Sequence, residues 1–276
     1  MKTAAVFFPF DLFGSAGTST GADLLADAFR EMLTDNRQEQ KPTRAAVYKG
    51  NVRVRQLAFE TLLAYMNWRK QGRAVAQQIL QRGDFLLWVA GNHLGVLPVY
   101  EEFSVLGPDT LILQFDAHLD IQDFSDCTDE LSHGNFLLHA ALPLAPIINI
   151  GCRDLLMLPE YVRKHYRQTF SAESLVVDES AVVHAVRAAA DRAKRIFIDI
   201  DCDVLDPADF PAVTNPVPFG ISSQALLRFL NAVWSERVAG VAISEFDPGR
   251  DRDDRCLHLL AWLLEYLLLK HYEPPS

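Results

Sequence analysis

Apolar runs of strand length recur along the chain, and most of them are separated by segments with helical spacing. Buried strands are predicted at residues 4–8, 45–48, 85–90, 110–115, 146–151, 174–177, 195–200 and 238–243. Helices are predicted at residues 21–33, 55–80, 156–165, 180–193, 222–234 and 256–270, and the long 55–80 stretch is one helix or two. Because strands and helices alternate, we expect an α/β fold of three layers, with a mainly parallel sheet of about eight strands covered on both faces.

Polar residues follow five of the predicted strands, just after the point where each strand ends. They are His93, Asp116, Arg153, Asp201 and Glu245. In open α/β sheets, ligands bind beyond the carboxyl ends of the strands. We therefore expect one cleft to collect these side chains.

Two clusters of metal-ligating residue types stand at such strand ends, Asp116-Ala-His118-Leu-Asp120 and Asp199-Ile-Asp201-Cys-Asp203. Alternate residues of an extended segment point to the same side, so the ligating side chains of each cluster are expected to lie together. Carboxylate and imidazole groups suit Mn, Zn or Fe, and several like-charged carboxylates are costly to bury without a cation. A single Asp-x-Asp is more simply explained as turn and helix-capping residues. His93 alone is likewise more simply explained as a hydrogen-bonded histidine of the core. The two clusters together predict a pair of divalent metal ions, for which Mn, Zn and Fe all stay open on the ligand types alone.

Composition narrows the domain organisation and the substrate. The 276 residues are 49% hydrophobic and contain no low-complexity linker, so we expect residues 1–276 to form one domain. The formal net charge of -10 argues against a nucleic-acid partner and favours a cationic or small polar substrate.

Cysteine use and hydropathy favour a cytoplasmic protein without a membrane span. The cysteines form neither a CxxC zinc pattern nor a dense disulfide framework; they are Cys127, Cys152, Cys202 and Cys256. The apolar run at the start of the sequence is interrupted by Pro9 and Asp11 and does not resemble a signal peptide. Residues 134–152 lack Asp, Glu, Lys and Arg, but Asn, His and Pro interrupt them, so a buried helix followed by a buried strand is predicted there.

Six segments, in order along the chain, resemble the motifs of the ureohydrolases, the arginase and agmatinase group of binuclear manganese enzymes. Ala90-Gly-Asn92-His93 resembles the family's Gly-Gly-Asp-His, Asp116-Ala-His118-Leu-Asp120 its Asp-Ala-His-x-Asp, and His133-Gly134 the His-Gly that follows. Ile150-Gly-Cys-Arg153-Asp154 is similar to Ile-Gly-x-Arg-Asp, Asp201-Cys-Asp203-Val-Leu-Asp206-Pro207 to Asp-x-Asp-x-x-Asp-Pro, and Glu245-Phe-Asp-Pro248 to Glu-Val-x-Pro. The shared order of the six motifs makes the resemblance specific.

The resemblance implies an arginase-like fold and a guanidino hydrolase that releases urea and leaves an amine. One manganese would be held by His93, Asp116, Asp120 and Asp201, and the other by Asp116, His118, Asp201 and Asp203, while Asp199 is not a ligand in this assignment. A hydroxide between the ions would attack the guanidinium carbon, Glu245 would fix the guanidinium, and His133 would shuttle protons or contact the substrate. The candidate catalytic residues are thus His133, Glu245 and Asp120. The family's trimers and hexamers make a homo-oligomer a candidate assembly.

Three departures from the family pattern bear on the metal and the substrate. Asn92 stands where the family has Asp, which removes a carboxylate that could orient His93. Residues 208–215 lack the glycines of the family's Ala-Pro-Gly-Thr-Gly-like loop, and Leu155-Leu156 stand where free-arginine arginases present an acidic residue to the α-amino group. Arginine within a peptide, which would give ornithine, is therefore a stronger candidate substrate than free arginine.

Other substrates and other classes of protein stay open on the sequence. Agmatine, guanidino acids and formiminoglutamate are the remaining family substrates. A zinc deacetylase of a related fold would hold one metal ion rather than two. A catalytically weak pseudoenzyme or binding module would keep the fold; Asn92 and the altered loop slightly favour it, whereas the retained ligand residues favour catalysis.

Overall fold

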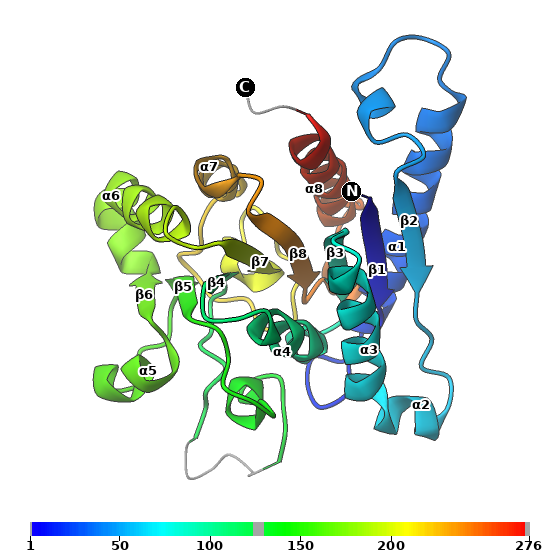
Figure 1. The fold of residues 1–276 in the computed structure, drawn as a ribbon. Coiled ribbons are helices and arrows are strands. Elements are labelled where there is room, and N and C mark those ends of the chain that lie inside the picture. Colours follow the sequence, from blue (N-terminus) through cyan, green and yellow to red (C-terminus); the bar gives the residue numbers. More distant parts are fainter. Residues whose placement is uncertain (1, 124–129, 274–276) are drawn as a thin grey trace.

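Eight parallel strands form one sheet through the protein (Figure 1). The computed structural model describes residues 2–123 and 130–273. The strands are β1 (Thr3–Phe8), β2 (Val52–Gln56), β3 (Phe85–Ala90), β4 (Thr110–Phe115), β5 (Ile147–Cys152), β6 (Gln168–Ser171), β7 (Arg195–Asp201) and β8 (Val238–Ser244). Their order across the sheet is β2-β1-β3-β8-β7-β4-β5-β6. The parallel α/β sheet predicted from the sequence is confirmed.

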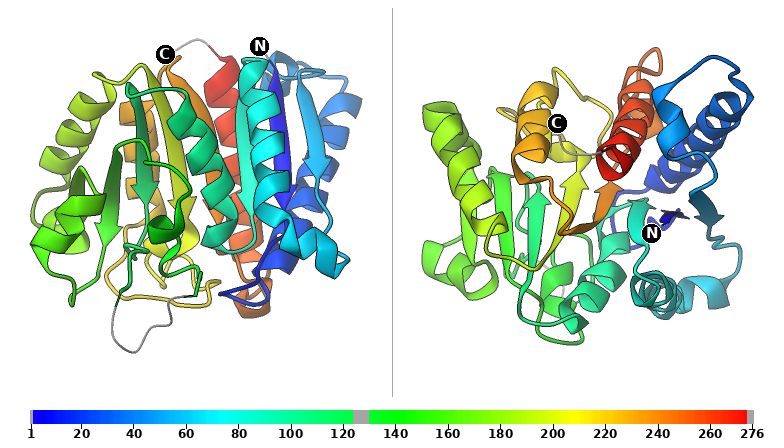
Figure 2. Two further views of the ribbon diagram at one scale, coloured as in Figure 1. Left: turned by 60° about the horizontal axis from the view of Figure 1, so that its bottom comes forward. Right: turned by 45° about the horizontal axis from the view of Figure 1, so that its top comes forward.

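Helices cover both faces of this sheet, which gives three layers (Figure 2). The helices are α1 (Thr18–Gln38), α2 (Leu62–Met66), α3 (Trp68–Gln81), α4 (Leu97–Val105), α5 (Pro159–His165), α6 (Ala172–Ala190), α7 (Ser223–Val233) and α8 (Arg255–Tyr272). Side chains of α1, α6, α7 and α8 form one apolar cluster with the sheet, and those of α3, α4 and α5 form a second cluster. The inner strands are buried on both faces, which explains why they appear in the sequence as continuous apolar runs.

The two edge strands do not lie where apolar runs predicted strands. Residues 45–48 lie in and just after a 3₁₀ turn (Arg44–Val47), and the edge strand β2 that follows alternates valine with arginine. Residues 174–177 belong to α6, whose first turn is capped by the Ser171 side chain, and the edge strand β6 precedes them. Edge strands are partly exposed and lack the continuous apolar pattern of inner strands, so the pattern favoured their apolar neighbours instead.

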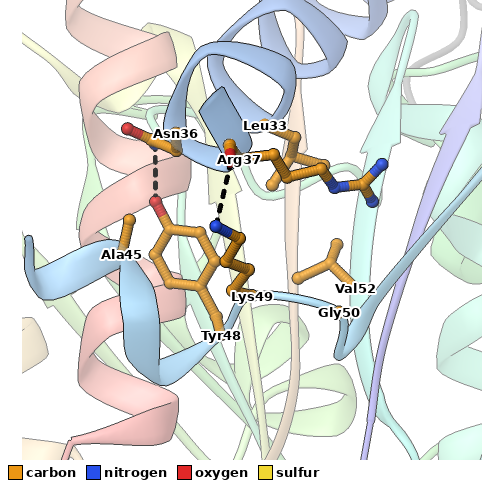
Figure 3. A pocket seen from close by; sticks show the side chains of 8 residues that line it. All are labelled: Leu33, Asn36, Arg37, Ala45, Tyr48, Lys49, Gly50 and Val52. Atoms are coloured by element: carbon orange, nitrogen blue, oxygen red, sulfur yellow. Dashed lines mark hydrogen bonds between the residues drawn. The ribbon is translucent and has the colours of Figure 1, made fainter. Parts of the chain in front are cut away.

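The turn that replaces the first of these predicted strands packs against the end of α1 (Figure 3). The Tyr48 hydroxyl accepts a hydrogen bond from the Asn36 side-chain amide at 2.8 Å and donates one to Glu265 of α8 at 2.6 Å. The Lys49 ammonium donates to the Arg37 carbonyl at 2.9 Å. The space left among these side chains is about 10 Å³, room for about one water molecule, so this region contributes packing rather than a binding site.

The helical predictions change in three places. Residues 55–80 comprise the end of β2, then α2 and α3, which Asn67 separates. Helix α4 was not predicted because most of its residues are buried and show no amphipathic pattern; its Glu101 is paired with Arg69 of α3. Residues 134–152, predicted as a helix and a strand, contain a 3₁₀ turn (Phe136–His139) and β5. Among the described residues, no helix has the length and hydropathy needed to cross a membrane.

Candidate metal centre

The four central strands β3, β8, β7 and β4 end at one edge of the sheet and bring four of the predicted site residues there. His93 begins the 3₁₀ turn (His93–Val96) after β3, Glu245 follows β8, Asp201 ends β7 and Asp116 follows β4. In the left view of Figure 2, the segments that follow these strands gather below the sheet. Strand order rather than chain order therefore makes these residues neighbours.

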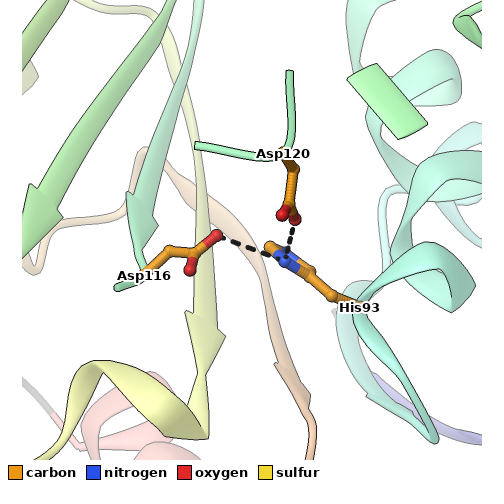
Figure 4. A group of neighbouring side chains, drawn as sticks. All are labelled: His93, Asp116 and Asp120. Atoms are coloured by element: carbon orange, nitrogen blue, oxygen red, sulfur yellow. Dashed lines mark ion pairs between the residues drawn. The ribbon is translucent and has the colours of Figure 1, made fainter. Parts of the chain in front are cut away.

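The His93 imidazole points between the Asp116 and Asp120 carboxylates (Figure 4). Its Nδ1 atom is 2.8 Å from Asp120 Oδ2, 3.3 Å from Asp116 Oδ2 and 3.2 Å from Asp201 Oδ2. All four side chains are buried. His93, Asp116 and Asp120 each offer a ligating atom within 4.8 Å of the others, a spacing that suits a shared cation.

A second group of potential ligands shares Asp116 with the first. His118 Nδ1 lies 2.8 Å from Asp203 Oδ2 and 3.9 Å from Asp116 Oδ1, and these three residues also offer atoms within 4.8 Å of one another. Asp116 therefore turns Oδ2 toward His93 and Oδ1 toward His118. Two adjacent cation positions with one bridging carboxylate are compatible with this arrangement.

Backbone N–H groups hold the ligand carboxylates in place. Asp116 Oδ1 accepts a hydrogen bond from the His118 N–H at 2.6 Å, and Asp201 Oδ1 accepts one from the Asp203 N–H at 3.0 Å. Asp203 Oδ1 in turn accepts from the Ala117 N–H at 3.2 Å, which ties the two clusters together. Each cluster thus turns on itself at its strand end, and this local turn explains why alternate residues converge.

The crowded carboxylates perturb one another and the two histidines. Burial and neighbouring carboxylates raise the pKa of Asp116 to about 7 and that of Asp201 well above its ordinary value. Burial lowers the pKa of the histidines, but adjacent carboxylates more than offset this effect and raise the pKa of His118 to about 10 and that of His93 well above its ordinary value. Without a cation, protonated imidazoles and carboxyls offset part of the local negative charge.

Two buried ligand atoms have no hydrogen-bonding partner among the described residues, His93 Nδ1 and Asp116 Oδ2. Nδ1 is close to three carboxylates but is aligned to donate to none of them. Buried polar atoms without partners are costly, and a divalent cation between these two atoms would satisfy both. The nitrogen and carboxylate donors contain no thiolate and suit manganese or a similar ion, so the residues fit the metal pair predicted from the sequence.

Glu245 and His133 lie beside the ligand groups. Glu245 has a left-handed backbone, with φ 67°, and its Oε1 accepts a hydrogen bond from the His93 backbone N–H at 2.8 Å. His133 Nδ1 lies 3.5 Å from that oxygen and 3.4 Å from Ser15 Oγ. Burial lowers the pKa of His133, but the Glu245 carboxylate more than offsets it and raises the pKa above its ordinary value. Glu245, His133 and Asp120, the three candidate catalytic residues, face the same cavity.

That cavity has a volume of about 310 Å³ and includes residues that the sequence did not single out. It is lined by His93, His118, Asp120, Gln122, His133, Gly134, Asp201, Asp203, Asn215 and Glu245. Gln122 continues the alternation of the cluster that ends at Asp120, and this pattern could have identified it. Asn215 ends the loop that departs from the family pattern, and no local feature indicated that its side chain faces the site. None of the described lining residues is Lys or Arg.

Arg153, although predicted at the same edge, does not line the cavity. Its guanidinium donates to the backbone carbonyls of Gly151, Asp203 and Val204, so it supports the chain after β7. Of the cysteines, Cys152, Cys202 and Cys256 are buried free thiols away from the lining, and Cys127 lies outside the described residues.

Asn92 is next to His93 in sequence, but another residue orients the His93 imidazole. The Asn92 side-chain amide donates to the Leu12 carbonyl at 3.0 Å, and in the described part of the chain it forms no hydrogen bond with the His93 ring. The sequence predicts that Asn92, in place of Asp, leaves His93 without an orienting carboxylate. In the structure Asp199 supplies one, with Oδ2 at 2.7 Å from His93 Nε2.

Comparisons with known sequences point to one family. The sequence pattern described as Arginase family matches residues 2–270. Agmatinase from Bacillus subtilis is 25% identical over 198 residues, which cover 69% of this chain and 65% of the relative. N(1)-aminopropylagmatine ureohydrolase from Thermus thermophilus is 27% identical over 182 residues, which cover 64% of this chain and 59% of the relative. The chain thus matches less than two thirds of the length of these curated relatives.

Solved structures show the same fold over nearly the whole chain. Arginase from Bacillus subtilis superposes with a TM-score of 0.81 at 17% identity and covers 97% of this chain and 98% of its own. A hypothetical agmatinase from Burkholderia thailandensis gives a TM-score of 0.79 at 18% identity and covers 98% of this chain and 86% of its own. At these identities the likeness concerns the fold.

Proposed function

The chain belongs to the arginase family, as its motifs predicted, and we propose that it is a metal-dependent hydrolase of a guanidino C–N bond. The observation that carries the proposal is the pair of His/Asp groups that share Asp116 beside a cavity lined by Glu245 and His133. Since the eight strands share one sheet, we also propose that residues 1–276 act as a single catalytic domain.

Two divalent ions, with Mn²⁺ as first choice, are assigned to the two ligand groups. His93, Asp116, Asp120 and Asp201 would hold one ion, and Asp116, His118, Asp201 and Asp203 the other. When bound, the ions would supply Lewis acidity and a water of lowered pKa, which hydrolysis at neutral pH requires. The His93 Nδ1 and Asp116 Oδ2 atoms, which have no hydrogen-bonding partner among the described residues, support this assignment.

Glu245 is proposed to bind the guanidinium group of the substrate. Its Oε1 is fixed by the His93 backbone N–H, and its Oε2 has no hydrogen-bonding partner in the described part of the chain. A guanidinium that donates to this carboxylate forms charge-assisted hydrogen bonds, which orient its planar carbon. Glu245 therefore sets the direction from which the guanidinium carbon is approached.

His133 is proposed to carry the proton that the leaving amine requires. Its Nδ1 lies near Glu245 and Ser15, which leaves Nε2 as the ring nitrogen available to the substrate. The side chain is 29% exposed, so it can exchange protons with solvent. After the oxygen of a water molecule has added to the guanidinium carbon, transfer of this proton to the amine nitrogen as the C–N bond breaks gives the amine and urea.

The charge of the cavity supports a cationic substrate without a free carboxylate. Bound metal ions would offset the lining aspartates, Glu245 would remain to bind the guanidinium, and the described lining offers no Lys or Arg to a substrate carboxylate. Arginine within a peptide meets this criterion. An agmatine-type amine, as in the names of the relatives, meets it equally. Free arginine, guanidino acids and formiminoglutamate do not.

A substrate panel tests this proposal. The Mn²⁺-loaded protein is incubated with agmatine, aminopropylagmatine, an arginine-containing peptide, free arginine, a guanidino acid and formiminoglutamate, and urea or formamide is measured. We expect urea from a compound without a carboxylate. Glu245→Gln keeps the side-chain size and should lower kcat/KM by about 10²-fold or more at unchanged metal content. Glu236→Gln, an exposed carboxylate before β8, is the matched control and should leave the activity unchanged.

Three outcomes would contradict parts of the proposal. Urea from free arginine alone would refute the substrate class. One tightly held zinc in place of two ions would refute the binuclear assignment and favour a deacetylase-like site. Two bound ions without urea or formamide from any compound would identify a pseudoenzyme.

A further inference from the structure

Asp199 lies next to the metal centre but belongs to neither ligand group. It sits on β7 two residues before Asp201, is fully buried and does not line the cavity. Its Oδ2 lies 2.7 Å from His93 Nε2 and accepts a hydrogen bond from the Tyr100 hydroxyl at 2.6 Å. The proposed reaction uses neither Asp199 nor Tyr100.

The two ring nitrogens of His93 have separate surroundings. Nδ1 faces the three ligand aspartates and Nε2 faces Asp199. A carboxylate at Nε2 keeps the imidazole proton on that nitrogen and leaves the Nδ1 lone pair for a metal ion. The Phe136 ring packs edge-on against the imidazole, with centroids 4.9 Å apart, and restricts its rotation. Asp199, on the Nε2 side of the ring, thus decides that Nδ1 is the nitrogen without a proton.

Tyr100 holds the Asp199 carboxylate in this orientation. Burial and then the Asp199 charge raise the pKa of Tyr100 well above its ordinary value, so its hydroxyl keeps its proton and donates. Tyr100 lies on α4 and Asp199 on β7, so the contact joins the helical layer to the strand that carries the ligands.

We propose that Asp199 is a positioning residue that selects the Nδ1-ligating tautomer of His93 and so sets the metal affinity of one of the two ion positions. Asn92, the neighbour of His93 in sequence, cannot take this role because its amide donates to the Leu12 carbonyl. An ionised carboxylate at position 92 could not donate a hydrogen bond to that carbonyl oxygen, because both groups are acceptors. The inference depends on the proposed metal centre, and the tests below separate the two.

Mn²⁺ binding by Asp199→Asn is the direct test. The variant keeps the side-chain size, but its amide can donate to Nε2 and so favour the tautomer with the proton on Nδ1. Titration calorimetry and equilibrium dialysis with metal analysis should show two ions in the parent. In the variant, one ion should bind about 10- to 100-fold more weakly and the other with parent affinity. If Asp199 had a purely structural role, the variant would bind both ions more weakly or both with parent affinity.

Two further variants control for stability. Glu101→Gln alters another buried carboxylate, adjacent to Tyr100 but paired with Arg69 rather than with a ligand. It should lower the melting temperature and leave both Mn²⁺ affinities unchanged. Tyr100→Phe removes one donor from Asp199 and should weaken the same ion as Asp199→Asn, by a smaller factor, because the carboxylate remains.

The outcomes distinguish the two proposals. Parent-like affinity for both ions in folded Asp199→Asn would overturn the role of Asp199 and leave the metal centre intact. A parent protein that binds no Mn²⁺ would overturn the centre itself, and this inference with it. If Asp199→Asn does not fold, Tyr100→Phe decides: an unchanged affinity at both positions refutes the inference, and a selective loss at one position supports it.

Discussion

Gly21 of α1 permits a close approach to the chain that carries Glu245. A Cβ atom at Gly21 would lie 2.0 Å from the Phe246 carbonyl oxygen, whereas ordinary contact begins at 3.4 Å. Gly21→Ala therefore requires a separation of about 3.4 − 2.0 = 1.4 Å. On the other side, the Glu245 N–H donates to the Gly91 carbonyl at 2.8 Å, so the segment cannot yield without losing this bond.

The expected cost combines two opposing effects. Overpacking against backbone costs about 3 kcal/mol at the upper end of its usual range, and replacing glycine within a helix returns about 1 kcal/mol. We therefore expect a net loss of about 2 kcal/mol in the free energy of unfolding, or about 4 °C in melting temperature for a chain of this size. Displacement of Glu245 by about 1 Å should also lower kcat/KM by roughly 10²-fold.

Thermal melting and steady-state kinetics test both effects, with Thr20→Ala as the matched control. Thr20 is exposed on the same helix, so this change gains helix propensity without a clash and should raise stability slightly. If Gly21→Ala melts at or above the parent temperature, the contact between α1 and Phe246 is not the rigid constraint inferred here. If it destabilises the protein but kcat/KM is unchanged, the position of Glu245 does not depend on that contact.

Three further outcomes are expected. Arg153→Met removes the donor to three backbone carbonyls and should lower the free energy of unfolding, measured by urea titration, by about 2–4 kcal/mol. Arg153→Lys should recover only part of this lost stability. An unchanged urea midpoint in Arg153→Met would contradict the support role of Arg153. Mn²⁺ at about 100 times its Kd should stabilise the fold by about 3 kcal/mol per ion, a gain that a chelator reverses, and no change in melting would count against the metal centre. The His271 imidazole stacks on Phe85, and burial lowers its pKa from an ordinary 6.5 to about 4. The neutral imidazole therefore stabilises the fold above pH 6.5 by about 1 kcal/mol, after allowance for partial exposure. This contribution is lost as the pH falls from 6.5 toward 4. His271→Phe should flatten that part of the stability profile, and equal slopes in parent and variant would refute the assignment.

Sequence patterns predicted the inner strands well because a strand buried on both faces consists of consecutive apolar residues. Strands β3 and β4 have the predicted bounds. The edge strands β2 and β6 were placed wrongly because partial exposure removes that pattern, and α4 was missed because its burial on most sides leaves no polar face. These failures share one cause: the local pattern reports burial, and burial depends on position in the sheet.

The sequence by itself determined which residues carry the candidate metal chemistry. In Asp116-Ala-His118 and Asp201-Cys-Asp203, the carboxylate accepts from a backbone N–H two residues later, so the convergence of alternate side chains is a local property. Only the tertiary structure decided what faces them. Asp199 meets His93 across 106 residues of sequence, and Asn215 reaches the cavity from a loop without a local pattern. Such contacts depend on the order of strands in the sheet, which brings distant segments together and which no short stretch of sequence specifies.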